Sequence, residues 1–354
     1  MSEAFHDRIA YVFLKADRFT YVVKVTQITP PQSNCYLVAT NSSIAIPVFR
    51  VNQSQLGKQL GIDDTFDAEL VWTDNANRIS AASNIKSIST SGVGYTGHII
   101  VETGSAEGNA VVAIKKNGVI LWSWHVWVAN YEPDVDAHGF MTRNLGALSQ
   151  TPGELSVQRL LYQWGRKDPF PGSANWNQEV EPVIYSALGQ TSVQKVQTPE
   201  NKNFGNSVKN PLTFYYTNTA DDVNSWYQWE SIRSDTLWGK NMVKSVYDPS
   251  PPGWRVASGA QLSNLVTLGY EYDVPNWGLF ISAGGGWFPS GMYRGGSHGN
   301  LQWFGGPNSY YWASCKKDGY NCLLISPHSV VMSSFSYSYA FAVRCVREED
   351  YYDY

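Results

Sequence analysis

The chain has 354 residues, which is long enough for two or three domains that each bury a core. Its formal net charge is −4 and its lysines and arginines are scattered, so the basic stripe expected of a nucleic-acid-binding protein is missing. Because no apolar run approaches the length of about 18 residues that a transmembrane helix needs, the sequence predicts no membrane span.

The N-terminal region predicts a pair of strands. Ile9–Leu14 and Arg18–Gln27 have the β-branched and aromatic character of strands, and Pro30-Pro31 ends the pattern. We therefore expect residues 1–30 to be a strand pair left from a preceding β module. The first residues do not resemble a signal peptide, so either a leader has been removed or the protein leaves its cell by another route, as a virion component would.

Residues 31–130 predict a β-sandwich domain. Short apolar runs separated by Gly, Asn and Ser turns are typical of this architecture. These runs are Ser43–Val51, Ala68–Trp72, His98–Val101 and Ala110–Ile114. Asn117-Gly118 then predicts a two-residue hairpin turn that leads into a strand at Val119–Trp127.

The pattern changes after Tyr131–Asp134, and residues 131–348 predict one α+β domain. Pro152–Trp164 has a proline suited to a first helical turn and a mainly one-sided set of leucines, which indicates a helix. A second helix is predicted at Ser258–Leu268, with Ser258 as its N-cap. The remainder is predicted to be short strands and long loops, followed by an acidic, tyrosine-rich tail at residues 349–354.

The four cysteines predict no zinc site, because they form no C-x-x-C pair and have no histidine at ligand spacing. Asp318-Gly319 is a strong hairpin signal. A two-residue turn there would place Cys315 directly opposite Cys322. The pair is therefore a candidate cross-strand disulfide in an oxidising compartment.

Several motifs, in order along the chain, resemble those of exported Bacteroidetes surface proteins. They are Leu121–Trp127, Met141–Ala147, Tyr162–Phe170, Asn210–Phe214, Pro251–Val256, Tyr311–Ser314 and Val343–Val346. The C-terminal part is similar to the Fibrobacter succinogenes major paralogous domain. That family has a C-type-lectin-like fold, shared with formylglycine-generating enzyme and with the variable proteins of diversity-generating retroelements. The resemblance, over residues 32–348, implies an outer-surface protein, often lipid-anchored or carried at a fimbrial tip.

Two further likenesses concern single elements. The strand Tyr21–Gln27 is similar to the closing strand of a BACON-type β-sandwich. Relatives commonly carry Cys where this chain has Ser250, and Pro where it has Ala257. If that Cys normally pairs with the one at Cys345, this chain has lost the bridge and Cys345 is a free thiol.

The sequence lacks the residues that calcium-dependent sugar binding requires, and it also lacks those that catalysis requires. Glu132-Pro133-Asp134 matches a calcium-lectin triplet, but it precedes the lectin-like domain and no Trp-Asn-Asp occurs, so a solvated linker turn is the better interpretation. We expect no metal and no cofactor. His125 lies in a tryptophan-rich strand typical of a core, and Asp318 is the only acidic residue from Gly284 to Arg344, whereas a glycosidase needs two carboxylates. The chain is therefore predicted not to be an enzyme.

The same C-terminal stretch has the composition of a recognition surface. Aromatic side chains interleaved with Gly, Ser and Asn combine large contact area with adaptable hydrogen bonds, and flat rings also stack on sugars. The candidate ligand-binding residues are Trp287, Tyr293, His298, Asn300, Gln302, Trp303, Asn308, Tyr310, Asn321, His328, Phe335, Tyr337 and Tyr339.

These features predict a calcium-independent adhesin at the cell surface, on the outer membrane or at a fimbrial tip. Its expected partner is a host or microbial glycan or surface protein. Two alternatives stay open: a structural subunit that packs against pilus or other cell-surface subunits, and a receptor-binding protein of a bacteriophage virion. Whether the segment 333–339 is diversified is not decided by one sequence.

Overall fold

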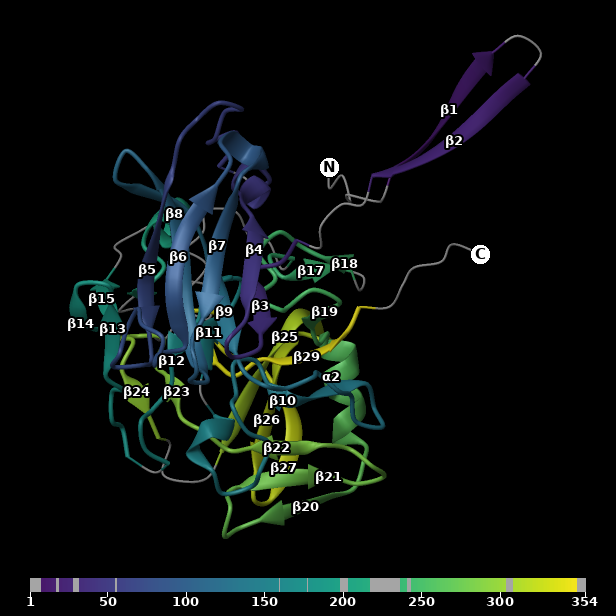
Figure 1. Ribbon diagram of the computed structural model, residues 1–354. Helices are drawn as coiled ribbons and strands as arrows, with labels where there is room; N and C mark the ends of the chain where they lie inside the picture. The colour runs from purple at the N-terminus through teal and green to yellow at the C-terminus, as the bar shows by residue number, and fades with distance from the viewer. Residues whose placement is uncertain are drawn as a thin grey trace. The chain divides into compact units, whose positions relative to one another are not determined.

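The computed structural model describes residues 8–16, 19–27, 32–54, 56–158, 160–176, 178–197, 203–216, 236–240, 243–303 and 308–348 (Figure 1). The protein is mostly β, with 45% strand and 8% helix, and its strands form multiple antiparallel sheets. The chain divides into two compact units, residues 1–32 and residues 33–354.

The first unit is a hairpin of two strands, β1 (Arg8–Ala16) and β2 (Phe19–Gln27). They pair antiparallel without a bulge, from Arg8 opposite Gln27 to Ala16 opposite Phe19. Both strands are rich in β-branched and aromatic residues, which favour the pleated conformation. The predicted N-terminal strand pair is therefore present.

The largest sheet of the second unit has six strands. In spatial order they are β14 (Gly189–Thr191), β13 (Ile184–Ser186), β5 (Asp67–Thr73), β8 (Gly108–Lys116), β9 (Val119–Val128) and β3 (Cys35–Val38). A three-stranded sheet contributes to the same core, in the order β4 (Ser43–Pro47), β7 (His98–Thr103) and β6 (Ile85–Ser91). Figure 1 shows β4, β5, β6, β7 and β8 in the upper part of the unit.

The centre of the six-stranded sheet confirms the predicted hairpin. Asn117 and Gly118 both have positive φ, and Lys116 lies opposite Val119, as a two-residue turn requires. Strands β8 and β9 are buried over most of their length, including Trp122, Trp124 and Trp127 of β9. A strand that is buried on both faces indicates that the sheet is covered on both sides.

The rest of the second unit consists of smaller sheets. They are β10 (Phe140–Asn144), β29 (Arg344–Arg347) and β19 (Trp254–Val256); β12 (Phe170–Pro171), β11 (Leu160–Gln163), β28 (Ala340–Phe341), β23 (Tyr293–Arg294) and β24 (Leu301–Gln302); β25 (Ser309–Lys317), β26 (Tyr320–Ser326) and β27 (Ser329–Ser333); β20 (Tyr270–Asp273), β21 (Gly278–Ile281) and β22 (Trp287–Pro289); β15 (Gln194–Gln197) and β16 (Thr213–Tyr216); and β17 (Gly239–Lys240) and β18 (Val243–Lys244).

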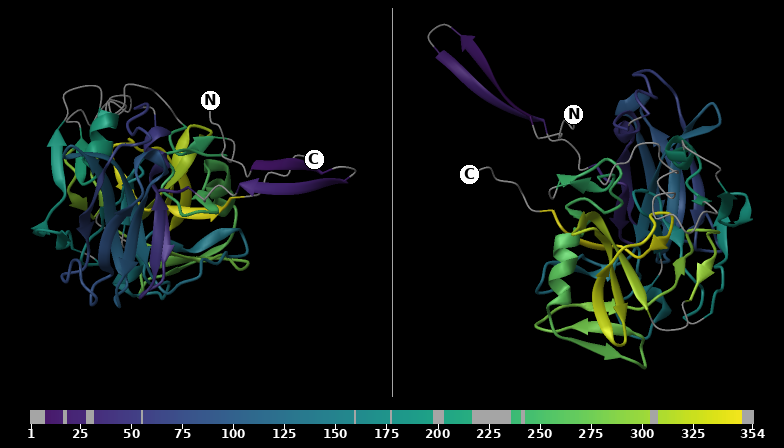
Figure 2. Two further views of the ribbon diagram at one scale, coloured as in Figure 1. Left: turned by 45° about the horizontal axis from the view of Figure 1, so that its top comes forward. Right: turned by 180° about the vertical axis from the view of Figure 1, so that it is seen from behind.

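One predicted helix is confirmed and one is wrong. Helix α2 (Gly259–Val266) begins after Ser258, which forms a capping box with Gln261, and it packs against the β25–β27 sheet (Figure 2). The segment Pro152–Trp164 instead contains a short 3-10 turn, η3 (Leu155–Val157), and the strand β11. The leucines of β11 pair with β12 rather than lying along a helical face, because burial in a sheet overrides local propensity.

Three short helical segments were not predicted. They are α1 (Asn203–Lys209), η1 (Val48–Asn52) and η2 (Gly94–Thr96). The last residues of the predicted run Ser43–Val51 lie in η1, so only the first part of that run, up to Pro47, is a strand. Among the helices in the described part of the chain, none has the length and apolar character that crossing a membrane requires.

The predicted boundary at residue 130 does not separate two compact units. Strand β13 follows that boundary in sequence but joins the six-stranded sheet, where Tyr185 pairs with Thr73 of β5. The buried Lys167 ammonium also donates to the Ser123 carbonyl of β9 at 3.0 Å. The described residues on the two sides of this boundary therefore pack against each other.

The hairpin at Asp318-Gly319 forms, but its cysteines do not pair. Lys317 lies opposite Tyr320 across the turn, as predicted, and an irregularity in β25 then shifts the register so that Cys322 lies opposite Trp312. Cys315 and Cys322 are both free thiols, and the predicted disulfide is therefore wrong. The extra residues of β25 displace Cys315 along the strand from its expected partner.

Candidate functional site

The structure separates the predicted ligand-binding residues by burial. Five have buried side chains: Trp287, Tyr293, Tyr310, Asn321 and Tyr337. The others are half-buried or exposed: His298, Asn300, Gln302, Trp303, Asn308, His328, Phe335 and Tyr339. Only the second set presents surface to a ligand, so the candidate site is built from it.

Tyr337 illustrates why the buried set belongs to the core. Its ring stacks on Trp164 with centroids 3.9 Å apart and meets the edge of Trp312, and only 1% of the residue is exposed. Asn321 also has a structural role, since its side-chain amide donates to the Phe335 carbonyl and accepts from the Phe335 N–H. The prediction that these residues face a ligand is corrected by this packing.

Three of these predicted residues lie close together: His298 and Asn300 in the turn before β24, and Gln302 in β24 itself. The backbone N–H of Asn300 donates to Nδ1 of His298 at 3.1 Å. The side-chain amide of Gln302 lies 3.0 Å from Nε2 of the same ring. The imidazole of His298 therefore contacts the backbone of Asn300 and the side chain of Gln302.

Lys195 connects this turn to a second segment of the chain. Its ammonium donates to Oδ1 of Asn300 at 2.8 Å and to Oε1 of Glu181 at 2.9 Å. Lys195 lies on β15, and Glu181 lies in the loop before β13, so the contact joins segments that are far apart in sequence. Neither residue belongs to any motif, which is why the sequence did not indicate them.

Glu181 is held in place by a buried arginine. The guanidinium of Arg294 donates to both carboxylate oxygens, at 3.0 and 2.8 Å, and also to the carbonyls of Pro171 and Gly299. Burial alone would raise the pKa of the Glu181 carboxyl, but Arg294 and then Lys195 outweigh it and lower the pKa below its ordinary value. Glu181 is therefore an ionised, oriented hydrogen-bond acceptor at neutral pH.

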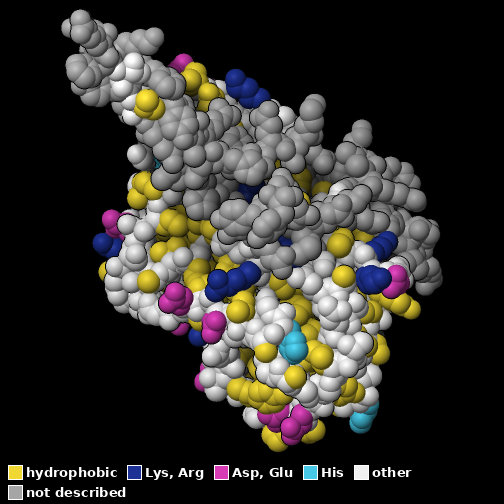
Figure 3. All heavy atoms as spheres, turned by 90° about the vertical axis from the view of Figure 1, so that its right-hand side faces the viewer, with side chains coloured by type: hydrophobic (Ala, Val, Ile, Leu, Met, Phe, Trp, Pro, Cys, Tyr) yellow, Lys and Arg dark blue, Asp and Glu magenta, His cyan; other side chains and the backbone are white. Residues whose placement is uncertain are grey.

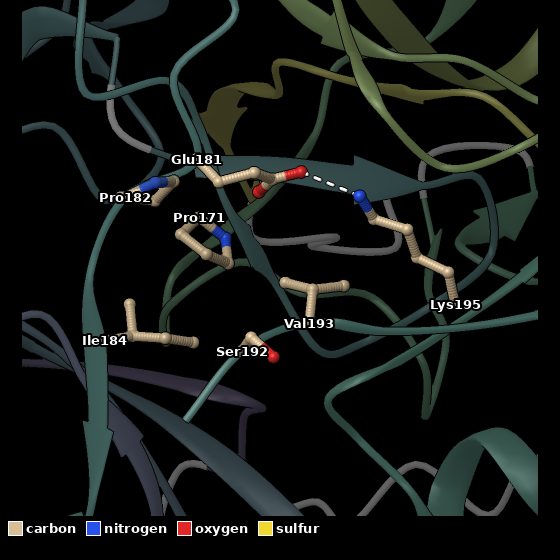
Figure 4. A pocket seen from close by; sticks show the side chains of 7 residues that line it. All are labelled: Pro171, Glu181, Pro182, Ile184, Ser192, Val193 and Lys195. Carbon is tan, nitrogen blue, oxygen red and sulfur yellow. Dashed lines mark hydrogen bonds and ion pairs between the residues drawn. The ribbon is translucent and has the colours of Figure 1, made fainter. Parts of the chain in front are cut away.

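A pocket of about 240 Å³ opens beside this ion pair. It is lined by Pro171, Glu181, Pro182, Ile184, Ser192, Val193 and Lys195. Figure 4 shows Glu181 and Lys195 pointing toward one another along one side, with the proline, isoleucine and valine side chains around the space. The pocket thus combines apolar walls with one charged pair and one hydroxyl.

Trp303 lies near the pocket and is part of a tryptophan pair. Its backbone N–H donates at 2.9 Å to Oε1 of Glu179, two residues before the pocket-lining Glu181. Its ring stacks on Trp277, with centroids 4.9 Å apart and planes 25° from parallel. Both tryptophans are half-buried. Trp277 was not predicted, because the contact depends on the turn between β20 and β21 reaching another loop.

The remaining exposed candidates lie outside this group. Phe335 and Tyr339 meet edge to face, with centroids 5.7 Å apart, beside the buried ring of Phe341. Asn308 is half-buried immediately before β25, and His328 lies exposed in the turn between β26 and β27. We define the candidate site as the pocket together with His298, Asn300, Gln302, Trp303 and Trp277.

In the described ranges, no group of three or more His, Cys, Asp or Glu side chains is arranged to hold a metal ion. The carboxylate of Asp136, near the calcium-lectin-like triplet, accepts from the backbone N–H groups of His138, Phe140 and Gly286. That carboxylate therefore organises its own loops. On the face seen in Figure 3, Lys and Arg side chains lie in separate small groups.

Two buried titratable groups away from the site, His125 and Cys345, are neutral. Burial lowers the pKa of His125 to about 3, and its Nε2–H donates to Oδ1 of Asn109 at 2.9 Å. Burial raises the pKa of the Cys345 thiol to about 12. Neither group has the protonation state of an activated base or nucleophile.

Comparison of this chain with protein-family models, with curated proteins and with solved structures gave no match.

Proposed function

We propose that this chain is a non-enzymatic ligand-binding protein of the cell surface, an adhesin in which a β-sandwich supports a C-type-lectin-like domain. One observation carries the proposal. His298, Asn300, Gln302 and Trp303, four residues with the chemistry of a recognition surface, lie together at the surface and connect through Lys195 to a pocket. Concave, mainly apolar sites with a few oriented polar groups are typical of ligand binding.

The rigidity of the site supports binding. Arg294 is inaccessible to solvent and fixes Glu181, which in turn fixes Lys195, so the polar groups are oriented before a ligand arrives. A preorganised site loses little conformational entropy on binding. The resemblance to exported Bacteroidetes surface proteins is consistent with a ligand outside the cell.

The chemistry of the pocket supports binding over turnover. Of its seven lining residues, Glu181 alone carries a carboxylate, whereas glycoside hydrolysis by the common mechanism needs two. The ion pairs that lower the pKa of Glu181 also make it a weak base. We therefore propose recognition by shape, hydrogen bonding and ring stacking, without calcium or another cofactor.

The test is binding of the purified chain to an array of glycans and of host and bacterial surface proteins, with and without EDTA. We expect EDTA-resistant binding that falls by about tenfold or more in His298→Ala and in Trp303→Ala, since each removes a direct contact. His328→Ala is the matched control, because His328 is exposed outside the site, and it should bind as the unmodified chain does.

Two outcomes would reject the proposal. If the folded chain binds nothing on the array, or if binding survives both site variants, the candidate site is not a recognition surface. Ordered self-association of the chain under the same conditions would favour the assembly-subunit function in its place.

A further inference from the structure

We infer that the pocket accepts one ring of an uncharged, hydroxyl-rich saccharide, and that Trp303 stacks on the next ring. The inference rests on the proposed function and names its ligand class. It is carried by the size of the pocket, the balance of its polar groups and the position of the tryptophan pair.

The volume of the pocket limits the ligand to a small group. At about 240 Å³, it falls below the roughly 300–1,000 Å³ of sites that enclose drug-sized molecules. A single sugar ring is of the right scale, whereas a peptide or nucleotide would extend far outside. A longer ligand must therefore continue along the neighbouring surface.

The polar groups of the pocket favour an uncharged ligand. Lys195 lies 2.9 Å from Glu181, Arg294 pairs with the same carboxylate, and the Glu179 carboxylate is two residues away. The formal charges of these four groups sum to zero, so the site offers no net charge to an acidic or a basic ligand. Lys195 uses two of its three N–H donors on Glu181 and Asn300, which leaves one donor for a ligand. A donor beside an acceptor matches two adjacent sugar hydroxyls, each of which both donates and accepts.

The apolar walls of the pocket suit the C–H groups on the face of a sugar ring. Pro171, Pro182, Ile184 and Val193 supply apolar surface. The C–H groups of a pyranose gain from burial against such surface, while the hydroxyls on the ring edge turn to Lys195, Glu181 and Ser192. A strongly hydrated phosphate or sulfate would lose its water here without a matching cluster of cations.

Trp303 provides surface for the adjoining ring. Its backbone N–H donates to the Glu179 carboxylate, two residues before Glu181, so the backbone of Trp303 lies close to the segment that lines the pocket. The stacked Trp277 supports one face of the indole and limits its rotation. A fixed aromatic surface stacks on sugar rings at low entropic cost.

The experiment compares three sets of probes on the full chain by ligand-observed NMR and calorimetry. They are neutral hexose monosaccharides, neutral hexose disaccharides and trisaccharides, and the same compounds bearing a uronate or a sulfate. We expect at least one neutral series to bind, with the disaccharides tighter than the monosaccharide. The acidic analogues of that series should bind more weakly.

Lys195→Gln should weaken binding of the neutral series by about ten- to a hundredfold, because it removes a charged donor. Lys115→Gln is the matched control: Lys115 pairs with Glu69 at 2.9 Å with similar exposure, on the six-stranded sheet. Trp303→Ala should weaken disaccharide binding and leave monosaccharide binding unchanged. Circular dichroism of each variant checks that the fold is retained.

The outcomes separate this inference from the proposed function. Preferred binding of acidic saccharides, or of proteins alone, would overturn the inference and leave the ligand-binding function standing. Equal binding by Lys195→Gln and Lys115→Gln would also overturn it, because the pocket would then lie outside the contact. Binding of no probe and no surface protein would reject both.

Discussion

At the residue scale, aromatic side chains from one stretch of the sequence have different roles in this protein. Tyr337 and Trp303 both belong to the aromatic, Gly- and Ser-rich stretch whose composition predicts a recognition surface. Tyr337 is 1% exposed and stacked on Trp164, whereas Trp303 is half-buried beside a pocket. Their difference comes from what packs around each ring, and a substitution at each position therefore has a different consequence.

Tyr337→Ala is expected to destabilise the fold rather than to abolish binding selectively. Removing a large buried ring leaves a cavity against Trp164 and Trp312, which costs about 3–5 kcal/mol. Urea unfolding measures this loss. Tyr337→Phe keeps the ring and should cost about 1 kcal/mol. A Tyr337→Ala protein as stable as the unmodified chain would show that the ring is not packed as described.

His125 predicts a specific loss of stability in acid. Burial lowers its pKa from 6.5 to about 3 in the folded protein, so between those values the unfolded chain binds a proton that the folded chain does not. Stability from this group is therefore full above pH 6.5 and falls as pH decreases toward 3, by roughly 1 kcal/mol per pH unit.

The measurement is chemical unfolding at pH 7 and pH 4.5 for the unmodified chain and for His125→Gln, which retains an N–H donor toward Asn109 but does not titrate. The unmodified chain should lose about 2 kcal/mol more than the variant over this interval. Carboxylates affect both proteins alike, so equal losses would mean that His125 is already solvated.

At the element scale, local chemistry determines where turns and helix caps form, whereas tertiary burial determines whether an apolar run becomes a helix or a strand. The Asn117-Gly118 turn and the Ser258 cap have local causes and appear where predicted. The leucines of Leu160–Gln163 satisfy a helical pattern equally well, but pairing with β12 and β28 holds them in a strand. The irregularity in β25, which separates Cys315 from Cys322, likewise has no local signal.

Ser258→Ala tests the cap of α2. The serine hydroxyl accepts from the Gln261 N–H, and the Gln261 side chain accepts from the Ser258 N–H. Losing the first of these bonds should cost about 1 kcal/mol, measured by thermal unfolding. Ser263→Ala is the comparison: Ser263 is half-buried inside the same helix and its hydroxyl donates to the Ala260 carbonyl at 2.8 Å. This substitution should change stability by less than about 0.5 kcal/mol. Equal effects would show that Ser258 does not act as a cap.

At the scale of the whole molecule, buried polar contacts join distant parts of residues 33–354. Lys244 donates to the Ser33 hydroxyl and to the carbonyls of Ser250 and Trp254, and Cys345 donates to Oγ of Ser250 at 3.2 Å. The start of this unit, the segment before β19 and the last strand therefore meet at one place.

Ser250→Cys is expected to form a disulfide with Cys345 under oxidising conditions, because the two side-chain atoms already touch. Closing a loop of this length typically stabilises a protein by about 2–4 kcal/mol. Mass spectrometry after thiol alkylation counts the bond, and unfolding with and without reductant measures its effect. The unmodified chain, treated with the same oxidant and reductant, is the control. The variant has five cysteines, so five free thiols in the oxidised protein, rather than three, would contradict the geometry.

Much of the secondary structure could be predicted because its causes are local. Alternating β-branched runs, a hairpin dipeptide and a capping box act within a few residues, so the mostly β class, the β8–β9 hairpin and α2 follow from the sequence alone. His298, Asn300, Gln302 and Trp303 could also be indicated, because they lie within six residues of each other.

Tertiary structure alone decided the rest. Lys195 and Glu181 belong to the site only because β15 and the loop before β13 approach Asn300. Trp277 belongs to it only because its turn reaches Trp303. It also decided which aromatic rings are core and which face solvent. These outcomes depend on contacts between residues up to more than a hundred positions apart, and such contacts are selected by the free energy of burying the whole molecule rather than by any local pattern.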